Sequence, residues 1–271
     1  MSNSLNEYSN WLRRMNNNPI GVYDSGFGGL SVWCELHRAL PDESLIYLGD
    51  GKNCPYGSLP AAQIRSLAET AVGDLVQRGC KMVVVACNTA TAAAISHLRE
   101  RFPEIPIVGL EPAVKPACRA ANSRNVGVSA SERSLQGEKF LTTLARYGEG
   151  VEVIKAVGRG WVEVVENNEE QGERTEQLVR EVVEPIIERG ADVIVLGCTH
   201  YPFLRNVIER VIGNREVAVI DSGEAVEKRV ESLLDEYGIR ATAGCEPRME
   251  FITYADEEYR NRLERKAMNS L

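Results

Sequence analysis

The sequence predicts an α/β fold made of two related domains with mainly parallel sheets. Short apolar runs alternate with helical patterns along almost the whole chain. Most of these runs are continuous β-branched stretches, which is typical of strands that helices cover on both faces of a parallel sheet. The order of strands and motifs also repeats once. Alternation of this kind is the signature of βαβ units.

Eight strands are expected, in two sets of four. The first set is 20–24, 45–50, 82–87 and 105–110, and the second set is 125–130, 152–157, 193–198 and 217–221. Helical patterns such as 61–79 and 175–190 lie between strands, and each ends in a glycine suited to a helix C-cap. After the second set, we expect an amphipathic helix in 224–238 and a strand followed by a helix in 248–268. This tail is expected to fold back onto the first domain.

The two sets are separated by a nearly constant offset. Cys87 and Cys198 lie 111 residues apart (198 − 87), and Ser25 and Ser131 lie 106 residues apart (131 − 25). A repeat of this length predicts two related domains rather than a solenoid of short units. The expected division is a polar N-terminal extension in 1–17, a first domain in 18–112 plus 223–271, and a second domain in 113–222.

The composition argues against several classes of protein. The chain has 271 residues and a net charge of −8 without a long basic run, so we expect no nucleic-acid partner. It has no run of 18 apolar residues and no signal-peptide pattern, so we expect no membrane span and a cytoplasmic location. The 7 cysteines form no CxxC pair and the histidines number only 3, which predicts free thiols and no metal site.

Polar side chains follow several of the expected strands. These groups are Asp24-Ser25-Gly26, Cys87-Asn88-Thr89, Ser129-Ala130-Ser131 and Cys198-Thr199-His200. In open α/β sheets, ligands bind beyond the carboxyl ends of the strands, so two facing domains would bring these groups to one cleft. The turn after the second strand adds Tyr56, Gly57 and Ser58 as ligand candidates, because a glycine allows close backbone approach.

Each of these residues taken alone also has a structural interpretation. A single cysteine at a strand end is commonly a small buried hydrophobic residue. The glycine-rich segment 24–31 lacks the spacing of a phosphate-binding loop, so it can be a tight turn in which Asp24 caps a helix. His200 can be a hydrogen-bonded histidine of the core. The sequence leaves both interpretations open for these residues.

Two cysteines at equivalent positions of a repeat favour a chemical role. A thiol just before a helix N-terminus feels the positive end of the helix dipole, so we expect a lowered pKa and available thiolate. One such thiol would suggest acyl transfer. Two thiols on opposite walls of a cleft can take a proton from one face of a carbon atom and return one to the other face. Asn88, Thr89 and Thr199 are suitable donors to stabilise the carbanion.

The motifs that carry this chemistry resemble one known family. The segments IGVYDSGFGGLSV, VVVACNTATAAA and VIVLGCTHYPFL are similar to those of the cofactor-independent aspartate/glutamate racemases, and GCTH rather than GCTE points to glutamate. The resemblance covers residues 20 to about 222. It implies two α/β domains related by a pseudo-twofold axis, with the active site between them. It also implies no cofactor, and a homodimer that supplies D-glutamate for peptidoglycan.

The resemblance further implies roles for individual residues. The implied catalytic residues are Cys87, Cys198, Asp24, His200 and Glu166. Cys87 acts on the D-isomer and Cys198 on the L-isomer. The implied substrate-binding residues are Asp24, Ser25, Tyr56, Gly57, Asn88, Thr89, Ser131, Thr199 and His200.

Three segments depart from the family pattern. The usual DTARVPYG is DGKNCPYG, which places Cys54 where the pattern has valine. The usual GTxGT loop keeps hydroxyls at Ser131 and Ser134, but Arg133 replaces its glycine. The usual CPxFVPLVE is VGRGWVEVVE, where alignment on the last residue gives Glu166 as the family's glutamate and leaves Glu163 as the alternative.

Two other functions are compatible with the sequence. The same scaffold can serve a racemase for aspartate or another amino acid, which a panel of substrates distinguishes. A non-catalytic protein that binds a small molecule between two domains is the other alternative, and it would leave the Cα proton of its ligand in place.

Overall fold

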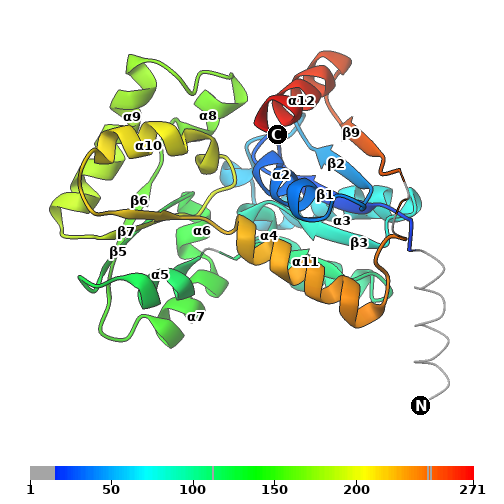
Figure 1. The fold of residues 1–271 in the computed structure, drawn as a ribbon, viewed down its shortest axis with the longest axis horizontal. Coiled ribbons are helices and arrows are strands. Elements are labelled where there is room, and N and C mark those ends of the chain that lie inside the picture. Colours follow the sequence, from blue (N-terminus) through cyan, green and yellow to red (C-terminus); the bar gives the residue numbers. More distant parts are fainter. Residues whose placement is uncertain (1–15, 112, 243, 245) are drawn as a thin grey trace.

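A computed structural model describes residues 16–111, 113–242, 244 and 246–271 of the chain. They form two α/β lobes that lie side by side (Figure 1). Most of the predicted N-terminal extension lies outside the described residues. No described helix is long and apolar enough to cross a membrane.

The first lobe is built on a five-stranded sheet with the order β4-β3-β1-β2-β9. Its strands are β1 (Ile20–Asp24), β2 (Leu45–Gly49), β3 (Met82–Val85), β4 (Ile107–Gly109) and β9 (Met249–Thr253). Its helices are α2 (Leu30–Ala39), η1 (Tyr56–Ser58), α3 (Ala61–Gln77), α4 (Asn88–Arg101), α11 (Gly223–Tyr237) and α12 (Glu257–Ser270). Apolar residues of α2, α11 and α12 pack on one face of the sheet, and those of α3 and α4 pack on the other.

The second lobe is built on a four-stranded sheet with the order β6-β5-β7-β8. Its strands are β5 (Asn125–Ala130), β6 (Glu152–Val157), β7 (Val193–Leu196) and β8 (Ala218–Ile220). Its helices are α5 (Val114–Ala120), α6 (Glu132–Gln136), α7 (Glu138–Tyr147), α8 (Trp161–Glu166), α9 (Glu173–Glu188), η2 (Tyr201–Leu204) and α10 (Arg205–Ile212). Here α5, α6 and α7 cover one face, and α8, α9 and α10 cover the other.

The predicted α/β fold with two parallel sheets is confirmed. All described strand pairs are parallel. The order β4-β3-β1-β2 in the first lobe corresponds strand by strand to β8-β7-β5-β6 in the second. This is the alignment that the sequence repeat predicts, and it makes β3 and β7 equivalent strands.

The chain after the second sheet returns to the first lobe. Strand β9 pairs with β2 in parallel, and Leu263 and Ala267 of α12 join the apolar core under α2. Buried β-branched and aromatic side chains hold this sheet together, so the five strands share one core. The boundaries at residues 112 and 222 stay our prediction for the division into domains.

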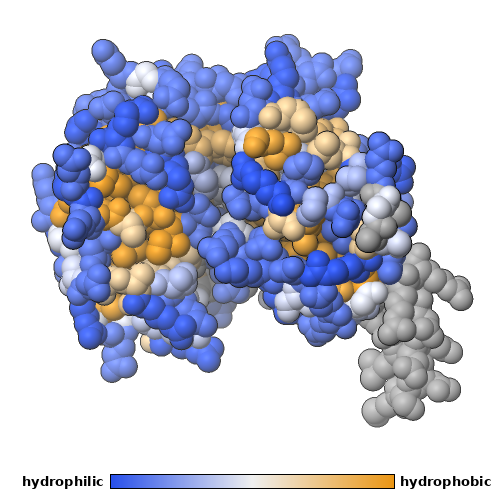
Figure 2. Space-filling view, viewed as in Figure 1, coloured by the Kyte–Doolittle hydropathy of each residue, from blue (hydrophilic) through white to orange (hydrophobic). Residues whose placement is uncertain are grey.

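The surface of the molecule is mostly polar. Figure 2 shows that hydrophilic residues cover most of one face, with hydrophobic patches on both lobes. β8 is an edge strand of its sheet. Exposed apolar area beside a sheet edge is a feature that proteins commonly cover by association.

Candidate active site

Cys87 lies between β3 and α4, in a fully enclosed position. It is the N-cap of α4, and its Sγ accepts a hydrogen bond from the backbone N–H of Ala90 at 3.4 Å. The Ser25 hydroxyl lies 3.6 Å from the same sulfur. Only 4% of Cys87 is exposed. A continuous apolar strand that ends two residues earlier therefore delivers the thiol to a helix start, as the sequence predicts.

The electrostatic prediction for Cys87 is wrong. Burial, followed by the nearby negative charge of Asp24, raises the pKa of the Cys87 thiol to about 12. The Ala90 N–H and the Ser25 hydroxyl act in the opposite direction and do not compensate. The helix N-terminus is present, but loss of hydration outweighs it because a thiolate in a dry site is costly. Cys87 is a protonated thiol near neutral pH.

Cys198 follows the equivalent strand β7 in a different setting. Its Sγ lies 3.8 Å from Nδ1 of His200, and the residue is half-buried. The next element is the 3-10 helix η2, and the α-helix α10 begins only at Arg205. The predicted helix directly after Cys198 is therefore displaced. Pro202 lies in this segment and has no N–H to donate to an α-helical hydrogen bond.

His200 is buried between a thiol and a carboxylate. Its Nε2 lies 2.6 Å from Oε1 of Glu166, and only 3% of the residue is exposed. Burial opposes a charge on the ring, yet the contacts with Cys198 and Glu166 raise the pKa of His200 well above its ordinary value. The alternative Glu163 is an exposed residue of α8, one turn away. Glu166 is the carboxylate that contacts His200.

Groups of the first lobe hold Glu166 in place. Its Oε1 also accepts the backbone N–H of Phe27 at 2.7 Å, and its Oε2 accepts the hydroxyl of Tyr259 at 2.8 Å. Burial opposes the charge of Glu166, but His200 and these donors lower its pKa below the ordinary value. Arg262 of α12 donates to the backbone carbonyl of Glu166. No motif in the sequence pointed to Phe27, Tyr259 or Arg262, because each of them acts through tertiary contacts.

The glycine-rich segment after β1 is a tight turn that permits close approach. A Cβ at Gly28 would lie 2.3 Å from Nδ1 of His200, so a side chain there would displace the imidazole. The turn therefore packs against the second lobe and is not a phosphate loop.

Asp24 joins the two lobes at the end of β1. It is fully buried, accepts the N–H of Gly26 at 2.7 Å, and accepts the hydroxyl of Thr199 at 3.1 Å. Burial raises the pKa of the Asp24 carboxyl to about 6, although the positive charge of His200 and these two hydrogen bonds lower it. The carboxylate is thus placed between Cys87, whose pKa it raises, and the Thr199-His200 pair.

The predicted substrate-binding residues fall into two groups. The first faces the space between the lobes. Thr89 Oγ1 lies 3.3 Å from Ser131 Oγ across the lobes, and Ser131 Oγ lies 2.8 Å from Ser134 Oγ. Asn88 Oδ1 is a buried atom with no hydrogen-bond partner among the described residues. A ligand with N–H donors would satisfy that atom.

The second group lies at η1. The Tyr56 hydroxyl donates to Oδ2 of Asp50 at 2.6 Å and lies 2.7 Å from the Tyr23 hydroxyl, so it already has partners. Only the backbone of Tyr56 and Gly57 is left for a ligand. Gly57 is exposed, and no atom lies within 4 Å of the position that its Cβ would take.

The two thiols meet across a narrow space. They are close enough that the charge of Cys198 raises the pKa of Cys87. The adjoining cavity, lined among others by Asn88, Cys198 and Thr199, measures about 10 Å³. This is about the volume that one water molecule needs, so the site is closed at that point in this conformation.

Two thiols with separate polar partners lie between two parallel sheets, and the chain belongs to the Asp/Glu/Hydantoin racemase family. The model of that family matches residues 30–229. Among relatives, the glutamate racemase of Ectopseudomonas mendocina is 44% identical over 224 residues, which are 83% of this chain and 85% of that protein.

Solved structures are similar as well. Glutamate racemase isoform RacE1 of Bacillus anthracis matches with a TM-score of 0.83 and 31% identity, over 93% of this chain and 94% of that one. Glutamate racemase of Francisella tularensis, solved in complex with D-glutamate, matches with a TM-score of 0.81 and 26% identity, over 94% of each chain.

Proposed function

We propose that this chain interconverts L- and D-glutamate and supplies D-glutamate for peptidoglycan. One observation carries the proposal: two cysteines at the ends of equivalent strands have different partners, His200 for Cys198 and Asp24 with Ser25 for Cys87. Racemisation by two bases needs one deprotonated and one protonated group at the same moment. The relatives named above, all glutamate racemases, support glutamate as the substrate.

In the L to D direction, Cys198 removes the α-proton as a thiolate. The raised pKa of His200 favours the imidazolium, whose Nδ1 lies 3.8 Å from the Cys198 sulfur. Glu166 keeps the ring charged and oriented through the 2.6 Å contact with Nε2. Cys87 then delivers its proton to the opposite face of the carbanion, because burial keeps that thiol protonated.

In the D to L direction, Cys87 must act as the base. The Ala90 N–H and the Ser25 hydroxyl stabilise its thiolate, and both lie within hydrogen-bond reach of the sulfur. Asp24 influences this step through its charge, so its protonation near pH 6 changes how easily Cys87 ionises. His200 and Cys198 then return a proton to the other face.

The substrate is held by groups around the two thiols. The α-ammonium donates to Oδ1 of Asn88, which has no partner among the described residues. Carboxylate oxygens accept from the hydroxyls of Thr89 and Ser131 and from the backbone of Tyr56 and Gly57, while the Thr199 hydroxyl stays hydrogen-bonded to Asp24. Preorganised donors of this kind stabilise a carbanion conjugated with a carboxylate. The reaction requires no cofactor.

The active form is a cytoplasmic homodimer. The family resemblance supports the dimer, and the hydrophobic patches on the two lobes offer apolar surface for association (Figure 2). Size-exclusion chromatography with light scattering tests this part, and a mass equal to one chain at working concentration would contradict it.

The function is tested by incubating the protein with L-glutamate in D₂O without added cofactor. We expect the optical rotation to decay to zero while deuterium enters at Cα, and no comparable rate with L-aspartate. The matched control is the double variant Cys87→Ser/Cys198→Ser. Unchanged rotation and retained Cα protons in the unaltered protein would overturn the proposal.

A further inference from the structure

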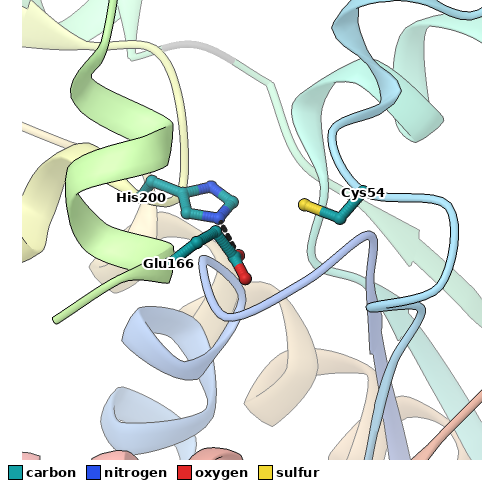
Figure 3. A group of neighbouring side chains, drawn as sticks. All are labelled: Cys54, Glu166 and His200. Atoms are coloured by element: carbon teal, nitrogen blue, oxygen red, sulfur yellow. Dashed lines mark hydrogen bonds and ion pairs between the residues drawn. The ribbon is translucent and has the colours of Figure 1, made fainter. Parts of the chain in front are cut away.

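Cys54 points into the active site from the loop between β2 and η1. Its Sγ, a carboxylate oxygen of Glu166 and a ring nitrogen of His200 lie within 4.8 Å of one another (Figure 3). In Figure 3 the sulfur faces the imidazole and the carboxylate from the opposite side. One thiol, one imidazole and one carboxylate form a ligand set that zinc uses in proteins.

The space between these ligands is kept open by a glycine. A Cβ at Gly26 would lie 2.3 Å from Oε1 of Glu166 and 2.8 Å from Sγ of Cys54, so any other residue would separate the two groups. Tetrahedral zinc with ordinary bond lengths places its ligand atoms about 3.3–3.6 Å apart. The 2.6 Å contact between His200 and Glu166 must therefore widen by about 1 Å, which a side-chain rotation supplies.

We propose that Cys54, Glu166 and His200 bind a thiophilic divalent cation such as Zn²⁺, and that the bound ion inhibits the enzyme. The ion forms one bond each to the Cys54 sulfur, a Glu166 oxygen and Nε2 of His200. The protons on Cys54 Sγ and His200 Nε2 leave to the solvent, and no electron is transferred. The thiolate and the carboxylate together neutralise the charge of the ion.

The bound ion would inhibit the enzyme because it occupies Nε2 of His200 and a carboxylate oxygen of Glu166. His200 bound to metal through Nε2 cannot also carry the second ring proton that makes it a cation beside Cys198. Glu166 no longer compensates that cation, because its charge is shared with the metal. The inhibitory part rests on the proposed racemase function, whereas the binding part does not.

Binding is measured with Co²⁺, which replaces Zn²⁺ and gives a sulfur-to-cobalt charge-transfer band when a thiolate is a ligand. We expect this band with the unaltered protein and with Cys118→Ser, whose half-buried thiol lies in α5. We expect it also with Cys87→Ser/Cys198→Ser, and its loss with Cys54→Ser. If the band persists in Cys54→Ser, Cys54 is not a ligand and the proposal is wrong. The proposal is also wrong if only the double variant Cys87→Ser/Cys198→Ser abolishes the band.

The inhibitory part is measured as the Zn²⁺ concentration that halves the racemisation rate of each variant, relative to its own rate with a chelator. Loss of an outer-shell partner typically weakens metal binding by roughly 10–100-fold, and loss of a direct ligand weakens it more. We therefore expect the half-inhibiting Zn²⁺ concentration to rise by at least that factor in Cys54→Ser. Cys54→Val, which restores the valine of the family pattern, serves as a second variant in case serine disturbs the fold. Equal Zn²⁺ sensitivity of Cys54→Val and Cys118→Ser would contradict the proposal.

Discussion

The two thiol segments come from equivalent strands, yet their environments differ in almost every respect. Cys87 caps an α-helix, is 4% exposed, and lies near the carboxylate Asp24. Cys198 lies in a turn, is half-buried, and contacts the imidazole of His200. The first environment favours a neutral thiol, because burial and a nearby carboxylate oppose its ionisation. The second places the sulfur beside an imidazole whose pKa is raised.

This difference is useful for a reaction that inverts a stereocentre. Two thiols in identical environments would ionise with equal probability, so neither of the two mixed states that the reaction needs would be preferred. The unequal partners of Cys87 and Cys198 give the two thiols different electrostatic surroundings before the substrate binds. Fold repetition supplies the two positions, and tertiary neighbours make them chemically distinct.

The largest expected effect is the loss of either thiol. Cys87→Ser and Cys198→Ser should each slow racemisation by about 10²–10⁴-fold, the usual contribution of an acid/base group. In D₂O, Cys87→Ser should still exchange the α-proton of L-glutamate, whereas Cys198→Ser should exchange that of D-glutamate. Proton NMR of each enantiomer measures this. The reverse pattern would show that Cys87 is the base for L-glutamate and Cys198 the base for D-glutamate.

A smaller effect is expected from removing the negative charge of Glu166, which contacts Nε2 of His200. Glu166→Gln should lower kcat about 10²-fold, the lower end of acid/base contributions, because a buried imidazole without that carboxylate loses its proton more easily. The alkaline limb of the pH–rate profile should then move to lower pH. Glu163→Gln is the matched control, since that side chain is exposed one turn away. If the two variants had the same pH–rate profile, Glu166 would not be the group that supports Cys198 through His200.

Asp24 should make the stability of the protein depend on pH. Its carboxyl has a pKa of about 6 in the folded protein against an ordinary value of 3.8. A raised pKa contributes stability that is fully present below the ordinary value and is lost as pH rises through 6. Relative to Asp24→Asn, the free energy of unfolding should fall by about 2 kcal/mol between pH 4 and pH 7, because part of the total effect is already lost at pH 4. Urea unfolding measures it, and a constant difference across this range would refute the shift.

The smallest effect concerns the hydroxyl beside Cys87. Ser25→Ala removes one hydrogen bond to the thiolate, worth about 0.5–1.5 kcal/mol, so kcat/KM should fall by about tenfold or less. The fall should be equal in both directions because the enantiomers have equal free energy. The limb of the pH profile that belongs to Cys87 should move to higher pH. Stopped assays from each enantiomer check this, and an unchanged profile would show that Ser25 does not act through Cys87.

Much of the fold was predictable because the core is periodic. Continuous apolar strands and glycine-ended helices predicted all eight strands of the repeat, although five of the eight were predicted too long. The strands expected at 82–87 and 193–198 end at Val85 and Leu196, because the chain turns away from the sheet just before each cysteine. The residues expected at the site are near one another for the same reason, since parallel strands end at one edge.

Other features were not predictable from local pattern. The lowered pKa expected for Cys87 was wrong, because the helix dipole is a local property whereas burial depends on the whole fold. The support of Glu166 by Phe27 and Tyr259 joins residues 139 and 93 positions apart. Cys54 appeared only as a departure from a family pattern, with no indication of what it faces.

The sequence by itself determined the parallel strands, the duplication and the two thiols at strand ends, since these follow from the order and polarity of neighbouring residues. Tertiary structure alone decided which thiol is dry, which one has a cationic partner, and which carboxylate supports that cation. The physical reason is that hydration and charge act through space. Their effect on a proton depends on which side chains the fold packs around it.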